Sequence, residues 1–154
     1  MAVTAQDIKQ LRDATGVSMM VCREALMEAD GDMTKAMDIL REKGALTASK
    51  KAGRDLGSGT VQAYIHNHGA VGAMVELLCE TDFVARNEEF QQIAKDIAMQ
   101  VAATDDELLA AGNEALLKEA FFKDPSRTLG SLIDGAVQKF GERTELGRIV
   151  KFAL

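Results

Sequence analysis

The sequence predicts an α+β protein in which a small helical module precedes a domain of mixed strands and helices. Residues 4–44 place their apolar side chains at helical spacing, whereas residues 60–66 and 146–154 alternate apolar and polar side chains as strands do, and residues 71–79 form a more fully apolar strand. The run GRDLGSG, residues 53–59, interrupts both patterns. We therefore predict a three-helix bundle over 1–44, a helical and Gly/Ser linker over 45–59, and a small antiparallel sheet packed with helices over 60–154.

The amino-acid composition and the charge disfavour several classes of function. The 154 residues are 47% hydrophobic and carry a formal net charge of -6, and residues 55–154 hold sixteen acidic against nine basic side chains. This charge disfavours general binding to nucleic acid or to an anionic membrane. No apolar run approaches the ~20 residues of a membrane span, residues 1–10 lack the pattern of a signal peptide, and Cys22 and Cys79 lie far apart in apolar surroundings. We expect a reduced, cytoplasmic protein.

The first 44 residues contain three short amphipathic segments. Each follows a residue suited to capping a helix, and each ends at or just before a glycine. Helices this short bury their apolar stripes only by packing on one another, which predicts a compact bundle of the ubiquitin-associated type. The expected helices cover residues 5–15, 19–29 and 33–43, with Thr4, Ser18 and Asp32 as N-caps and Gly16, Gly31 and Gly44 as stops. Residues 45–54 are also expected to be helical and to lead into the second domain.

In the second domain, residues 60–66 and 71–79 are predicted to form a hairpin with one face buried, joined by the turn Asn67-His68-Gly69. Asn87 caps the most regular predicted helix, whose apolar face begins at Phe90 and reaches Val101. A looser helical pattern over 104–122 is expected to end at Asp124-Pro125. Thr128 then caps a last helix that Gly141 terminates, and residues 146–154 form a third strand.

Two stretches contain residue types found in metal sites or nucleotide-binding loops. His66 and His68, with Cys79, Glu80 and Asp82, are residue types that bind metals, but the histidines flank a turn and the cysteine ends an apolar strand. The Gly57-Ser58-Gly59 stretch matches no nucleotide-binding pattern. No nucleophile with an orienting base accompanies the acids. We expect neither a metal, a cofactor nor an enzymatic activity.

The segment Glu80-Thr81-Asp82-Phe83-Val84-Ala85-Arg86 places an aromatic residue in a short link between strand and helix. Phe83 is either a buried loop anchor or an exposed contact for a partner. The same question applies to Met19 and Met20, since methionines serve both in cores and on partner surfaces.

These residues carry a family resemblance. The motifs are Leu11-Arg12, Thr15-Gly16 with Met19-Met20, Lys43-Gly44, Lys50-Lys51-Ala52, and above all CETDFVARNEEF over residues 79–90. The sequence resembles the short members of the bacterial elongation factor Ts family, closely over residues 1–103 and more loosely over 129–152. Residues 104–127 have no counterpart in the resemblance.

The resemblance implies a guanine-nucleotide exchange factor. Such a protein binds elongation factor Tu in its GDP form, expels GDP by disturbing the Mg²⁺ and phosphate site, and leaves when GTP binds. By match to the family motifs, Thr81, Asp82, Phe83 and Val84 would disturb the magnesium site. Arg12, Met19 and Met20 would contact the partner from the bundle, with Arg23 and Lys51 as weaker candidates. It also implies a homodimer in a two-to-two complex.

Three alternatives remain. The bundle could bind some other peptide while the second domain dimerises, which would make this an interaction module outside translation. A metal-dependent hydrolase could use His66, His68 and Asp82. RNA binding is a further alternative, disfavoured by the net charge and the single tyrosine.

Overall fold

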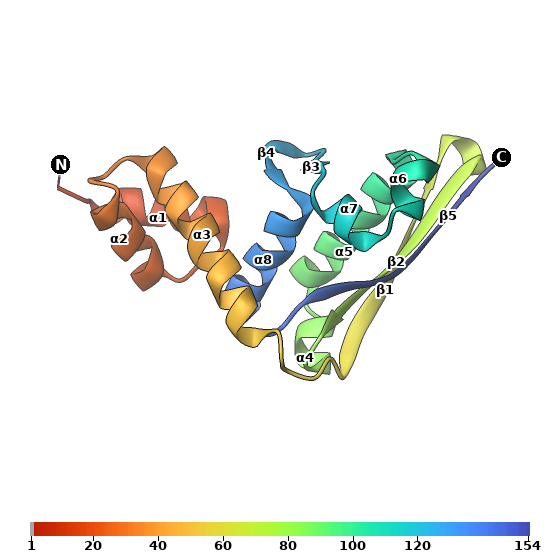
Figure 1. The fold of residues 1–154 in the computed structure, drawn as a ribbon. Helices are drawn as coiled ribbons and strands as arrows, with labels where there is room; N and C mark the ends of the chain where they lie inside the picture. Colours follow the sequence, from red (N-terminus) through yellow and green to blue (C-terminus); the bar gives the residue numbers. More distant parts are fainter. Residues whose placement is uncertain (1) are drawn as a thin grey trace.

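The computed structural model describes residues 2–154, and these begin with three helices around a common core (Figure 1). The helices are α1 (Ala5–Thr15), α2 (Met19–Glu28) and α3 (Met33–Lys51). The predicted caps are confirmed: the Asp7 amide donates to Thr4 Oγ1, and the Lys35 amide donates to Asp32 Oδ1 at 3.0 Å. The three helices share one apolar core, so the predicted packing of the helices is confirmed. The likeness of this bundle to the ubiquitin-associated type stays a prediction. Its buried members include Leu11, Cys22, Ala25, Leu26, Ala36 and Leu40.

The predicted stop at Gly44 is wrong, because α3 continues for two further turns to Lys51. Gly44 is buried where α3 crosses α8 (Leu129–Phe140). A Cβ at Gly44 would lie 3.2 Å from Gln138 Oε1 and 3.6 Å from the Asp134 carbonyl oxygen. Glycine therefore serves helix packing here rather than termination, and the part predicted as a helical linker is the second half of α3. The three-part division of the chain stays a prediction.

A three-stranded antiparallel sheet forms the other end of the molecule (Figure 1). Its strands β1 (Ser58–His66), β2 (Val71–Cys79) and β5 (Glu145–Ala153) lie in the order β1-β2-β5. The predicted hairpin and third strand are thus confirmed. The 3-10 turn η1 (Asn67–Gly69) closes the hairpin with three successive residues at positive φ, a conformation that asparagine and glycine tolerate well.

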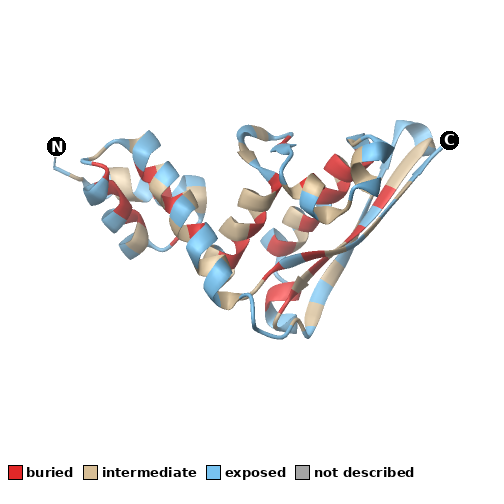
Figure 2. Cartoon of the chain, in the orientation of Figure 1, coloured by how far each residue is buried: buried red, intermediate tan, exposed pale blue. Residues whose placement is uncertain are grey.

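The two faces of this sheet differ. Helix α5 (Glu88–Ala103) packs across the inner face, against β1 and β2. On β1, Gln62 and Tyr64 point inward, while Val61 and Ile65 are exposed on the outer face. One face of the hairpin is buried as predicted, yet the apolar set of β1 lies on the opposite face. Figure 2 shows buried and exposed residues alternating along the strands of the sheet.

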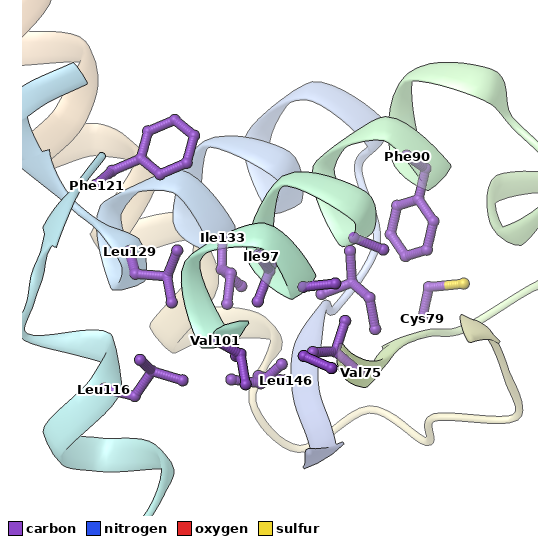
Figure 3. Close-up of a cluster of buried hydrophobic side chains, with 14 of the residues drawn as sticks. Val75, Cys79, Phe90, Ile97, Val101, Leu116, Phe121, Leu129, Ile133 and Leu146 are labelled. Carbon is purple, nitrogen blue, oxygen red and sulfur yellow. The ribbon is translucent and has the colours of Figure 1, made fainter. Parts of the chain in front are cut away.

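The core of the second domain lies between the sheet, α5 and α8 (Figure 3). Phe90 is fully buried and meets Phe140 edge-on, with 5.7 Å between ring centroids. Asn87 and Thr128 cap α5 and α8, and Gly141 ends α8 in the left-handed conformation, all as predicted. The fully buried side chains of this core include Leu77, Cys79, Ile97, Val101, Leu116 and Leu129.

The prediction for residues 104–127 is wrong in part. Two short helices, α6 (Asp106–Ala110) and α7 (Asn113–Leu117), are followed by a small hairpin of β3 (Ala120–Phe121) and β4 (Asp124–Thr128). The buried side-chain amide of Gln100 donates to the Ala120 carbonyl and accepts from the Phe122 amide, which holds this stretch extended. Pro125 stands within β4. Because this sheet has only two strands, β4 is an edge strand, and edge strands tolerate proline.

Helix α8 joins the two parts of the chain. It lies between α3 and the rest of the second domain (Figure 1), in contact with α3 and contributing Leu129 and Ile133 to the second core. Two polar contacts reinforce the joint: Arg41 Nη2 donates to Ser126 Oγ at 3.2 Å, and Lys51 Nζ donates to the Gly141 carbonyl at 3.0 Å. The bundle and the sheet domain are thus held together through packed side chains and not only by residues 52–57.

Candidate partner-binding site

The segment after β2 forms the short helix α4 (Asp82–Ala85) where the sequence indicated only a link. Thr81 caps it, since its hydroxyl accepts from the Val84 amide at 3.4 Å. A helix of four residues has almost no stability of its own, so contacts with the rest of the domain must hold it.

Phe83 is 84% exposed, which decides between its two interpretations in favour of an accessible side chain. Asp82 is also exposed and forms an i,i+4 ion pair with Arg86 at 3.4 Å. Val84 and the following Ala85 are buried and anchor the helix to the core. Of the four candidate residues, Thr81, Asp82 and Phe83 are accessible, and Val84 lies inside.

The chain just before Phe83 is tied to the turn between α8 and β5. Glu142 accepts from the Thr81 amide at 3.0 Å and from the Thr81 hydroxyl at 2.7 Å. Glu80 accepts from the Arg143 amide at 2.8 Å, and this hydrogen bond lowers the pKa of Glu80, helped by the Arg54 charge. The buried thiol of Cys79 donates to the Thr81 carbonyl at 3.2 Å, and burial raises its pKa to about 11.

The bundle residues form a separate surface. Met19 and Met20 begin α2 and are 48% and 71% exposed, and Arg12 and Arg23 are exposed as well. In Figure 1, α1 and α2 lie at one end of the molecule and α4 lies beside the sheet. The candidate residues therefore lie in two separate regions of the molecule rather than in one cluster. Lys51 differs from the rest, because its ammonium is engaged with the Gly141 carbonyl at the joint.

The hydrolase alternative does not fit the geometry. His66 and His68 are exposed at the hairpin turn, and Tyr64 Oη lies 2.9 Å from His66 Nδ1. Asp82 follows the far end of β2, so roughly 25 Å of strand separates it from the histidines at ~3.3 Å per residue. Among residues 2–154 no cluster of three or more His, Cys, Asp or Glu side chains could hold a metal ion. None of the helices in this described part is long and apolar enough to cross a membrane.

Two features of the structure were not predicted from the sequence. Gly141-Glu142 belongs to the looser part of the family resemblance, but its contact with Thr81 was not predicted, because the two residues are 61 positions apart. The outer face of the sheet is marked only by the alternation within each strand, which does not say which set of residues is covered. This face exposes the apolar side chains of Val61, Ile65, Met74, Val150 and Phe152.

Comparison with known proteins agrees with this arrangement. A family model described as elongation factor TS matches residues 80–154, which include α4 and the Glu142 turn. The elongation factor Ts of Thermodesulfovibrio yellowstonii is 41% identical over 192 aligned positions, covering 99% of this chain and 96% of the relative. That of Desulfotalea psychrophila is 44% identical over 153 positions, covering 99% and 76%.

The longer alignment contains at least 38 positions with no residue in this chain, because 192 aligned positions exceed its 154 residues. The relative therefore carries at least 38 residues within the aligned region that have no counterpart in this chain. At this identity and coverage, and with the family model matching the half that contains α4, the chain belongs to the elongation factor Ts family.

Proposed function

We propose that this chain is a guanine-nucleotide exchange factor for elongation factor Tu that acts in the cytoplasm, without cofactor, metal or covalent chemistry. The proposal rests on one observation above all: Phe83 stands 84% exposed on a helix that is anchored on both sides. An exposed phenylalanine gains little burial energy within its own fold, and aromatic side chains are enriched among the residues that carry the binding energy of interfaces.

The mechanism needs only a rigid wedge. Mg²⁺ in a nucleotide site holds phosphate oxygens at short, fixed distances, so displacing its supporting loops by about an ångström weakens nucleotide binding. Phe83 would enter between elements of the partner's nucleotide domain, while Asp82 and the Thr81 cap would fix its direction. Val84 would contribute from within the core, as the anchor that keeps α4 from yielding.

The bundle would supply affinity. Met19 and Met20 present adaptable apolar side chains, and Arg12 and Arg23 add positive charge at the same end of the molecule. Lys51 would act indirectly by holding α3 to the end of α8. Because the bundle and α4 are joined through α3 and α8, one partner could engage both surfaces, and binding at the bundle would direct Phe83 to its target.

Thermodynamic linkage between binding of this factor and binding of GDP to the same partner then accounts for nucleotide exchange. A factor that binds the nucleotide-free partner more tightly than the GDP form must weaken GDP binding by the same ratio. GTP binding would reverse the cycle and release the factor.

A homodimer is part of this proposal, and the sheet supports it. Ile65 and Phe152 on the outer face are 65% and 72% exposed, and Ile65 pairs with Gly72, which in turn pairs with Phe152. An apolar patch of this kind on one face of a sheet is typical of an interface. A second copy could cover it face to face about a twofold axis, giving a two-to-two complex with the partner.

The dimer is tested by sedimentation of the intact chain. Ile65→Lys is expected to shift the protein from dimer to monomer, because it places a charge within the proposed interface. Phe122→Lys, at an exposed site on the β3–β4 hairpin, is the matched control and should leave the dimer intact. A wild-type monomer at micromolar concentration would contradict the dimer without affecting the exchange proposal.

The exchange activity is tested by release of a fluorescent GDP analogue from elongation factor Tu. The wild-type chain should accelerate release, and Phe83→Ala should abolish most of that acceleration while keeping the wild-type melting curve. Phe122→Ala removes another exposed phenylalanine and should leave the rate unchanged. A folded wild-type chain that does not accelerate release would refute the proposal and favour an interaction module.

A further inference from the structure

We propose that Glu142 is the positioning residue of the Phe83 helix: its carboxylate holds Thr81, and thereby α4, in the orientation that presents Phe83. The inference deepens the proposed function and depends on it for its meaning in exchange. The clamp itself can be tested without any partner.

The geometry is that of a two-point clamp. One carboxylate oxygen, Oε1, accepts from the Thr81 backbone amide at 3.0 Å, and the other, Oε2, accepts from the Thr81 hydroxyl at 2.7 Å. Two hydrogen bonds to a single residue fix both its position and its rotation.

Thr81 passes this constraint directly to the helix. Its hydroxyl donates to Glu142 and accepts from the Val84 amide, so the clamp sets the rotamer that makes the N-cap. Its carbonyl accepts from the Cys79 thiol. The polar groups of Thr81 are thus all engaged, and Phe83 follows only two residues later.

Gly141 explains how Glu142 reaches this place. It ends α8 at a φ of 72°, and its amide donates to the Val137 carbonyl at 2.9 Å, which reverses the chain at once. The next residue is thereby brought beside the end of β2. The adjacent Glu80–Arg143 hydrogen bond is a second tie between the same two segments, so loss of the Glu142 clamp should loosen α4 without unfolding the domain.

Three substitutions at Glu142 separate the effect of side-chain length from the effect of charge. Glu142→Gln keeps the length and an acceptor oxygen but loses the charge, and its amide nitrogen can donate to the Thr81 hydroxyl. Glu142→Asp keeps the charge but is one methylene too short. Glu142→Ala removes both. Glu145→Ala is the control, because Glu145 lies on β5 and accepts from Arg143 Nε at 3.0 Å.

The first measurement is amide hydrogen exchange of the free, full-length chain. Protection of the Thr81 and Val84 amides should fall about tenfold in Glu142→Ala and Glu142→Asp, and should stay within about twofold of wild type in Glu142→Gln and Glu145→Ala. Unchanged protection in Glu142→Ala, or equal loss in Glu142→Gln, would overturn the clamp. If Glu142→Ala fails to fold, the Asp and Gln pair alone decides the question.

The second measurement is the dependence of GDP release on the concentration of this chain. A loosened α4 must be ordered during binding, so Glu142→Ala and Glu142→Asp should raise the half-saturating concentration about tenfold and leave the maximal rate unchanged. Phe83→Ala should instead lower the maximal rate. A lowered maximal rate in Glu142→Ala would overturn the positioning role. Failure of the wild type to accelerate release would refute the proposed function alone, since the amide measurement tests the clamp independently.

Discussion

Phe83 and Phe90 lie seven positions apart in one motif, and alanine at each should separate activity from stability. Phe83 is 84% exposed, so about a sixth of its surface is covered, whereas Phe90 is fully buried. A phenylalanine buries about 200 Å² when fully covered, and ~25 cal/mol per Å² then gives about 0.8 kcal/mol for Phe83. For Phe90 the loss of burial plus the cavity amounts to about 3–5 kcal/mol.

The edge-to-face contact with Phe140 adds to the cost at Phe90, by about 0.5–1.5 kcal/mol. Urea unfolding of both variants, with the free energy extrapolated to water, measures the difference. Phe83→Ala should lie within about 1 kcal/mol of wild type, and Phe90→Ala should lose at least about 3 kcal/mol. A loss above 3 kcal/mol for Phe83→Ala would refute its exposed position and, with it, the wedge.

Three further predictions concern the joint and the buried ionisable groups. Gly44→Leu should destabilise the chain by about 1–3 kcal/mol in thermal unfolding, because a side chain there would push α3 away from α8; a stabilised variant would contradict the close packing. Cys79, with its pKa raised to about 11 from 9.0, should be alkylated at pH 8 about 100-fold more slowly in the folded than in the unfolded chain, and equal rates would show that it is not buried. Burial raises the pKa of Asp134 above 3.8, so its charge destabilises the fold at neutral pH. Asp134→Asn should therefore stabilise the chain at pH 7. This gain in stability should shrink as the pH falls through the raised pKa toward 3.8. A gain that persists at pH 3.5 would point to another cause.

Local signals predicted most of the helices. Thr4, Asp32, Asn87 and Thr128 each cap a helix because a side-chain oxygen reaches an amide two or three residues away, an interaction contained within the sequence segment itself. The strands were also predicted from local signals, β1 and β5 from alternation of apolar and polar side chains and β2 from a short apolar run. Their order in the sheet was not predicted, because pairing depends on contacts between distant segments.

The errors have non-local causes. Gly44 has the residue type of a helix end, and only the neighbouring α8 explains why the helix runs through it. The extended stretch around Phe122 depends on a hydrogen bond to Gln100, which lies in helix α5. The same holds for the site: Phe83 could be named from the motif, but its exposure and its link to Glu142 required the three-dimensional structure.

The outer face of the sheet illustrates a further limit. Val61 and Ile65 alternate with polar residues as core positions do, yet they are exposed, while Tyr64 faces the core. Alternation specifies two faces without saying which one the same chain covers. Covering by a second copy, as proposed above, would reconcile the apolar pattern with the exposure.

The central claim is that this chain favours the nucleotide-free partner, and equilibrium binding tests it most directly. The dissociation constant of the wild-type chain should be measured for nucleotide-free and for GDP-bound elongation factor Tu, and the dissociation constant of GDP should be measured with and without the chain. We expect tighter binding to the nucleotide-free form, by the same factor by which the chain weakens GDP binding. Equal affinity for the two forms would contradict it.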